Sequence, residues 1–206
     1  MLSLELLGRS LCLSEFPTRP DIIGLGMSDW DGYASVLAQK FSYQNTYYHQ
    51  EPRLDIRDID PKLEGTMDFV ISSDVFEHVP PPVSMAFENA RRLLKPNGIL
   101  VFSTPYSKET ETVEHFPELN DYQLQKSNGE YVLKNVTKNG LKQVFKNLVF
   151  HGGKGATLEM RVFSESSLMR EFQRAGFRNV TIHKTPNFEH GIYWQYEWSL
   201  ILSARR

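Results

Sequence analysis

The sequence has little cysteine: Cys12 is the only one among its 206 residues. An intramolecular disulfide and a metal site built from several cysteines are therefore excluded, and Cys12 is interpreted as a small apolar core residue. The sequence also lacks a run of about 20 apolar residues, the length that a membrane-spanning helix needs. At the N-terminus no basic cluster precedes the apolar stretch, and Glu5 interrupts it, so we expect no secretory signal. These absences predict a soluble, cytoplasmic protein with no membrane partner.

The sequence also lacks a large excess of either positive or negative charge. The chain has 23 Lys and Arg against 25 Asp and Glu, which gives a formal net charge of −2. Nucleic-acid-binding surfaces are positively charged, so we expect no nucleic-acid partner. The 40% of hydrophobic residues is typical of a soluble globular protein, and the length suits an α/β domain with an insertion. We therefore predict one domain over residues 1–206, of unknown oligomeric state.

Apolar runs separated by turn residues predict strands that alternate with helices. We expect strands at 22–25, 46–49, 53–56, 68–72 and 99–103, and helices at 33–41 and after the prolines at 80–82. Strand–helix–strand units of this kind form a parallel sheet covered by helices. Farther along, we predict a helix at 165–175 capped by Ser164 and ended by Gly176, and strands at 180–183 and 198–204.

Residues 107–157 interrupt the alternation. Asn128-Gly129 and Asn139-Gly140 stand between short runs that contain apolar residues. Asn-Gly is a strong hairpin signal, because both residues accept positive φ. The segment is predicted to be a small antiparallel insertion of two or three strands, placed after the fifth strand of the sheet.

The block from Met67 to Tyr106 carries the most specific pattern. Its run FVISSDVFEHV, followed by RLLKPNGILVFSTP, resembles the fourth strand, helix and fifth strand of class I S-adenosylmethionine (SAM)-dependent methyltransferases, type 11 or 23. The later run RVFSESSLMREFQRAGFRNVTI resembles the next helix and strand of the same group. The resemblance implies a Rossmann-like, doubly wound, mostly parallel sheet of seven strands, whose last strand is antiparallel between its neighbours. It also implies SAM as the cofactor and methyl transfer to oxygen or nitrogen of a small-molecule acceptor.

The resemblance places SAM at the carboxyl ends of the strands, where ligands bind such sheets. The loop with Gly24, Gly26 and Ser28 corresponds to the family's three-glycine pattern, with Ser28 in the third glycine's place. The family's carboxylate at the end of strand one is missing here. Asp29 either takes its role or caps the following helix.

Further cofactor contacts follow from the resemblance alone. Glu51 corresponds to the acid on the ribose hydroxyls, with a solvated loop acid as the alternative. Asp55 and Ile56 correspond to the adenine contacts, with a turn aspartate bonded to its own backbone as the alternative for Asp55. The end of the fourth strand supplies Ser73, Asp74, Val75 and His78, although His78 could instead cap the proline loop.

Methyl transfer from a sulfonium loses charge in the transition state, so alignment of the reactants does most of the catalysis. A hydroxyl or ammonium acceptor also needs a base, and histidine is the usual choice near neutral pH. His115 and His151 flank the insertion that, by resemblance, covers the acceptor pocket. They are the main candidate catalytic bases, His78 is a less favoured one, and structural hydrogen bonding is the alternative for each. A metal ion held by a pair of histidines is a further alternative, but no ligand spacing supports it.

Two other functions remain possible at this point. The incomplete glycine pattern also fits a protein of this fold that binds SAM without catalysis. A nicotinamide-dependent dehydrogenase would need a fuller G-x-G-x-x-G pattern. The next glycine after Gly26 is Gly32, so we rank this function last.

Overall fold

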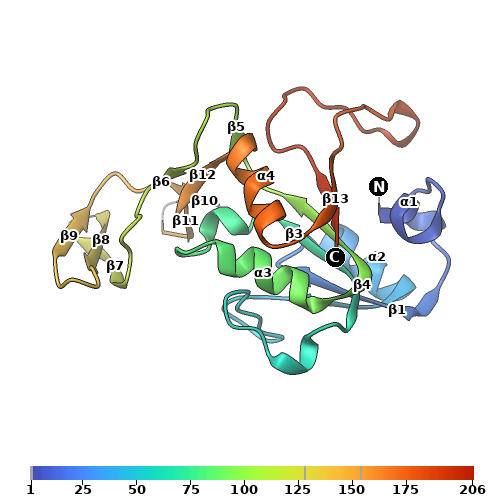
Figure 1. Ribbon diagram of the computed structural model, residues 1–206, viewed down its shortest axis with the longest axis horizontal. Helices are drawn as coiled ribbons and strands as arrows, with labels where there is room; N and C mark the ends of the chain where they lie inside the picture. The colour runs from blue at the N-terminus through green and yellow to red at the C-terminus, as the bar shows by residue number, and fades with distance from the viewer. Residues whose placement is uncertain (1, 128, 154) are drawn as a thin grey trace.

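The centre of the molecule is a mixed sheet with the strand order β13-β14-β4-β3-β1-β2 (Figure 1). The computed structural model describes residues 2–127, 129–153 and 155–206. β1, β2, β3 and β4 are parallel, whereas β14 is antiparallel to both β4 and β13, as the resemblance implied. The bounds are β1 Arg19–Met27, β2 Phe41–Thr46, β3 Met67–Ser73, β4 Leu94–Ser103, β13 Arg178–Ile182 and β14 Leu202–Arg205.

Helices cover both faces of this sheet (Figure 1). α3 and α4 cover one face of the sheet and contribute to the larger apolar cluster. α2 covers the other face, together with the N-terminal segment that includes α1. No helix of the described residues is long and apolar enough to cross a membrane. The α-helices are α1 Leu2–Leu7, α2 Asp31–Lys40, α3 Ser84–Leu93 and α4 Glu165–Arg174; the short 3-10 helices are η1 Leu13–Glu15, η2 Pro61–Leu63, η3 Phe76–His78 and η4 Phe188–His190.

Alternation along the strands builds the two cores. In β3, Phe69 and Ile71 enter the cluster beneath α2, whereas Val70 enters the cluster beneath α3 and α4. Successive strand residues point to opposite faces of a sheet, so a strand buried on both sides is apolar throughout. This explains why the apolar runs at β3 and β4 were the clearest strand signals in the sequence.

A three-stranded antiparallel meander lies away from the main sheet, at the left of Figure 1. Its turns include Gly129 and Gly140, both at φ +81°, whereas Asn128 of the first predicted Asn-Gly pair lies outside the described residues. Leu133 is completely buried in a small core with Phe116 and Met160. The meander is β7 Asp121–Ser127, β8 Glu130–Val136 and β9 Lys142–Phe145; shorter strands are β5 Tyr106–Ser107, β6 Val113–Glu114, β10 Phe150–His151, β11 Thr157–Leu158 and β12 Arg161–Ser164.

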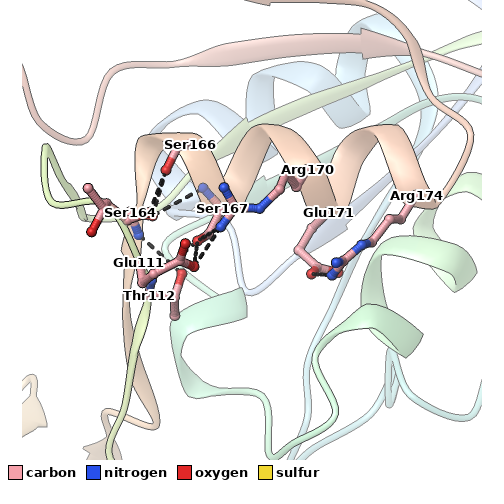
Figure 2. A network of polar contacts seen from close by, with 9 residues as sticks. Glu111, Thr112, Ser164, Ser166, Ser167, Arg170, Glu171 and Arg174 are labelled. Carbon is pink, nitrogen blue, oxygen red and sulfur yellow. Dashed lines mark hydrogen bonds and ion pairs between the residues drawn. The ribbon is translucent and has the colours of Figure 1, made fainter.

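The start of α4 is fixed by a polar network (Figure 2). The Ser164 hydroxyl accepts a hydrogen bond from the backbone N–H of Ser167 at 3.1 Å, so the predicted helix cap is confirmed. Thr112 joins from the preceding loop: its hydroxyl accepts from Ser164 N–H at 3.2 Å, and its N–H donates to the Ser167 hydroxyl at 3.2 Å. Arg170 pairs with Glu111 at 2.6 Å. The network thus ties the segment after β4 to α4.

Two strand predictions are wrong. β2 begins at Phe41, directly after α2, so the strand predicted at 46–49 lies too late in the chain. At 53–56 the structure has a turn: Asp55 accepts from Arg57 N–H through its carboxylate at 2.9 Å and from Asp58 N–H through its carbonyl at 2.9 Å. An aspartate that bonds its own backbone competes with strand pairing. The main sheet therefore has six strands among the described residues, where seven were predicted.

Candidate active site

A cavity of about 810 Å³ opens where β1, β2 and β3 end. Met27 and Ser28 line it from the end of β1, Thr46 from the end of β2, and Asp74 and Val75 from beyond β3. Ligands of open α/β sheets bind at the carboxyl ends of the strands. The volume falls within the range of roughly 300–1,000 Å³ that small-molecule sites occupy.

Two residues at this edge have left-handed backbone. Ser28 has φ +57° and Asp74 has φ +53°, each directly after its strand. Their N–H groups continue the ladder, to the carbonyls of Thr46 at 2.7 Å and Ser103 at 2.9 Å. Non-glycine residues in this region cost about 1 kcal/mol or more, and such strain concentrates at functional sites. Ser28 thus keeps the chain path that a third glycine would allow.

The turn after β2 contributes a second wall. Asp55 and Ile56 both line the cavity, and Ile56 is only 5% exposed. The carboxylate of Asp55 also accepts the backbone N–H of Arg57, which is the turn geometry left open as the alternative. The two interpretations are compatible, because a carboxylate accepts through both oxygens.

Gly24 and Gly26 lie within β1 and are not among the lining residues. A Cβ atom on Gly24 would lie 2.1 Å from Cζ of Phe69, and one on Gly26 would lie 1.9 Å from the hydroxyl of Tyr43. Neither distance leaves room for a methyl group. Close packing of aromatic side chains therefore explains both glycines.

Asp29 is buried beneath the loop, with 4% of its surface exposed. Its carboxylate accepts the Tyr43 hydroxyl, and its N–H donates to Asn45 Oδ1 at 2.9 Å. Burial raises the pKa of Asp29, against the hydrogen bonds from Tyr43 and Tyr33. Asp29 does not cap α2, whose N-cap is Trp30. It fixes the loop shape from below.

Two more predicted cofactor residues lie away from the cavity lining. Glu51 is exposed and accepts from Arg53 N–H at 2.9 Å, which matches the alternative of a loop acid. Ser73 bonds the Ser103 hydroxyl at 2.9 Å and lines a smaller cavity of about 310 Å³.

A further part of the cavity wall is a cluster of titratable side chains. His78 from η3 and His151 from β10 both line the cavity, with ring centroids 4.7 Å apart. Glu77 lies behind them, with 1% of its side chain exposed, and its Oε1 is 3.7 Å from His78 Nε2 and 4.0 Å from His151 Nδ1. Burial raises the pKa of Glu77 to about 7 and lowers that of His78. Burial therefore favours the neutral imidazole of His78.

A family model described as "Methyltransferase domain" matches residues 12–182. The chain belongs to this methyltransferase family. The family predicted from the Met67–Tyr106 block is confirmed, and the matched range includes the strands that form the cavity as well as the histidine cluster.

Solved structures share the fold of this methyltransferase at low identity. A putative SAM-dependent methyltransferase from Listeria monocytogenes has a TM-score of 0.55 and 13% identity, with 100% of this chain and 99% of that chain covered. A 1,6-didemethyltoxoflavin-N1-methyltransferase from Burkholderia thailandensis has a TM-score of 0.54 and 16% identity, with 100% and 75% covered. A SAM-dependent methyltransferase from Clostridium acetobutylicum has a TM-score of 0.53 and 10% identity, with 99% and 96% covered. Among curated proteins, none matches the sequence.

The two predicted bases of the methyltransferase occupy different positions. His151 Nε2 bonds Glu159 Oε2 at 2.7 Å and faces the cavity, whereas His115 Nε2 bonds the other oxygen of Glu159 at 2.8 Å and is not among the lining residues. Sequence reasoning missed Glu159 and the burial of Glu77. The only sequence signal for Glu159 is a carboxylate between Leu158 and Met160, in a short apolar run.

Proposed function

We propose that this methyltransferase binds SAM in the cavity at the carboxyl edge of its sheet and methylates a small-molecule acceptor. The family match over residues 12–182 carries the proposal. SAM supplies an activated methyl group on a sulfonium. The position of the cavity, beyond the ends of three parallel strands, supports a nucleoside-containing ligand.

The residues around the cavity fit the parts of SAM. Asp55 and Asp74 offer carboxylates that accept hydrogen bonds from hydroxyl or amino groups, and Ile56 and Val75 offer apolar side chains for a flat ring. Ser28 adds a hydroxyl beside the strained turn of the β1 loop. We assign these five residues to the cofactor.

Of the other predicted cofactor residues, three receive indirect roles in this proposal, and His78 is assigned to the acceptor side of the cavity instead. Gly24, Gly26 and Asp29 determine the loop shape through packing and through the Tyr43 hydrogen bond. Glu51 and Ser73 are left out of the contact set, because neither lines the cavity.

We place the acceptor beneath the segment 107–157, which we propose to act as a cap on a single domain. Tyr122 from β7 and Gly152, Ala156 and Thr157 from the later part of the segment line the cavity. The Burkholderia structure contains bound 1,6-didemethyltoxoflavin, which supports a small-molecule acceptor. Proton removal from the acceptor would take place at the wall formed by His78 and His151.

His115 has a positioning role in this scheme. It holds Glu159 from the side opposite His151, with hydrogen bonds of 2.8 and 2.7 Å to the two carboxylate oxygens. An imidazole whose second nitrogen is bonded to a carboxylate is fixed in tautomer and orientation. We therefore propose that His115 acts through Glu159 on His151.

Calorimetric titration with SAM, its demethylated product and NAD tests the proposal. SAM and its product should bind and raise the melting temperature, since a ligand of the native state stabilises it by mass action. Binding of NAD alone would refute the assignment. SAM binding without transfer to a broad panel of hydroxyl and amine acceptors would favour the non-catalytic alternative.

The variant Asp55→Ala tests the adenosyl site, with Asp58→Ala as its matched control. Asp58 is an exposed aspartate three residues on that is not among the lining residues. Loss of one hydrogen bond to a charged group weakens binding by about 1.5–3 kcal/mol, or roughly 10–150-fold. Equal SAM affinity of the two variants would remove Asp55 from the site.

A further inference from the structure

Three side chains that can each donate an electron pair converge at the cavity wall. The donor atoms are Oε1 of Glu77, Nε2 of His78 and Nδ1 of His151, and they lie within 4.8 Å of one another. Two of the three residues, His78 and His151, line the cavity. The cluster therefore joins η3 to β10, which lie far apart in the sequence.

The hydrogen bonds of the two imidazoles assign their tautomers. Nδ1 of His78 lies 2.9 Å from the carbonyl of Leu158, which can only accept, so Nδ1 carries the hydrogen and Nε2 is bare. Nε2 of His151 lies 2.7 Å from the Glu159 carboxylate, so the neutral imidazole of His151 carries its hydrogen on Nε2 and has a bare Nδ1. Both bare nitrogens face Glu77 Oε1.

Glu77 brings a buried oxygen that lacks a partner. The Thr104 hydroxyl donates to Oε2 at 2.9 Å, but no hydrogen bond to Oε1 is found among the described residues, and the side chain is 1% exposed. Its separations of 3.7 and 4.0 Å from the imidazole nitrogens are too long for hydrogen bonds. They are close to the spacing of ligand atoms around a shared metal ion, roughly 3–4 Å for bonds of about 2.0–2.2 Å. A cation among the three donors resolves their mutual repulsion.

We propose that Glu77, His78 and His151 bind a divalent first-row transition-metal ion at the wall of the cavity. Two imidazoles and one carboxylate suit Zn²⁺ and its neighbours, whereas Mg²⁺ and Ca²⁺ prefer oxygen ligands alone. Three protein ligands leave a coordination position open for a further ligand.

The surroundings match those of bound metals. A metal-ligating histidine normally donates its second N–H to a carbonyl or a carboxylate, which fixes the ring. Leu158 O serves His78 in this way, and Glu159 serves His151 while His115 holds its other oxygen. A backbone bond from Met160 N–H to the Glu77 carbonyl, at 2.8 Å, keeps the two halves of the cluster together.

The open position has a consequence for the acceptor that rests on the proposed function. His78 and His151 line the cavity, so a molecule there can reach an ion held between them. A metal ion lowers the pKa of a bound hydroxyl, whose proton then passes to solvent water while the oxygen stays on the ion. The site therefore favours an acceptor that presents an alcohol or phenol oxygen.

Metal titration of the chelator-treated protein tests the site. Calorimetry with Zn²⁺ and metal analysis after dialysis should give about one ion per chain, and Co²⁺ should give a visible absorption spectrum of bound metal. His78→Gln and His151→Gln should abolish the spectrum, whereas the matched control His183→Gln should retain it, because His183 bonds Ser203 between β13 and β14. Glu159→Gln should weaken Zn²⁺ binding by about 10–100-fold, as expected for an outer partner of a ligand.

Circular dichroism of each metal-free variant verifies folding, and the side chain of His151, 35% exposed, offers a site where substitution is least disruptive. Wild-type protein that binds no Zn²⁺, or a His151→Gln variant that binds it as tightly, would overturn the site. Binding that Mg²⁺ displaces at equal concentration would also overturn it. SAM titration of the same metal-free protein separates the two proposals: SAM binding without metal binding refutes only the metal site, and metal binding without SAM binding refutes only the proposed function.

Discussion

Replacing Gly24 by alanine tests whether the first glycine of β1 serves packing or ligand binding. Gly24 pairs with Tyr43 of β2 on one side and with Phe69 of β3 on the other. Phe69 is completely buried, stacked on Tyr43 with ring centroids 5.9 Å apart and against Phe41 at 5.6 Å. Its ring therefore has two aromatic neighbours that limit its movement.

The size of the effect follows from the lack of space. The new methyl carbon would lie 2.1, 2.4 and 2.6 Å from three ring atoms of Phe69. Carbon atoms in contact lie about 3.5–4.0 Å apart, so the ring must move by roughly 1.5 Å. Overpacking of this kind costs typically about 1–3 kcal/mol, and we expect about 3 kcal/mol here because Tyr43 and Phe41 must move too. For a domain of this size that lowers the melting temperature by about 6–12 °C.

Urea unfolding followed by circular dichroism measures this loss. A double-mutant cycle with Phe69→Leu tests whether the Phe69 ring causes this loss of stability, because the smaller side chain leaves room for the methyl group of Gly24→Ala. We expect the two changes together to cost about 1–2 kcal/mol less than the sum of the single changes, as for residues in direct contact.

The packing explanation would be refuted by a Gly24→Ala variant as stable as the wild type. Normal stability with loss of SAM binding would show in addition that the glycine serves the ligand, as the family pattern suggested. Additive costs in the cycle would show that Phe69 is not the side chain that excludes the methyl group.

Three further changes test other parts of the structure. Ser164→Ala removes the α4 cap and should cost about 1 kcal/mol in urea unfolding, whereas the control Ser166→Ala, outside the cap position, should cost less. Burial raises the pKa of Asp29, so the stability that its protonated form contributes is present below the unfolded pKa and is lost as pH rises through the raised folded pKa. The free energy of unfolding of Asp29→Asn should therefore increase relative to that of the wild type as pH rises from about 4 to 7. A difference between the two proteins that stays constant with pH would contradict this. Arg161 has a completely buried side chain and pairs with Glu114 at 2.6 Å, so Glu114→Gln should cost about 3 kcal/mol by leaving a buried charge unpaired; a loss below about 1 kcal/mol would disprove that role.

Local sequence signals predicted part of the fold well. β3, α3 and β4 were found from apolar runs and a proline-rich start, and α4 was found from the cap at Ser164 and the positive φ of Gly176. β2 was misplaced because α2 passes into the strand at Phe41 with no Gly or Pro residue between them. A strand was predicted in place of the turn at Asp55 because Leu54 and Ile56 alternate with polar residues, which is typical of a strand.

The site was predictable only where its residues follow strands. Ser28, Asp55, Asp74 and Val75 were located by their position after strands or expected strands, and they line the cavity. The contact between η3, which carries Glu77, and β10, which carries His151, joins residues far apart in the sequence, so no local pattern predicts it. It depends on backbone hydrogen bonds such as that from Met160 N–H to the Glu77 carbonyl at 2.8 Å.

The left-handed backbone at Ser28 and Asp74 has a consequence for protein engineering. Glycine adopts this conformation without steric cost, so a library screened for heat resistance alone should enrich glycine at both positions. Such variants would lose the Ser28 hydroxyl and the Asp74 carboxylate from the cavity in which we propose that SAM binds. A screen for thermal stability would then select glycine at these two positions, whereas a screen for catalytic turnover would retain Ser28 and Asp74.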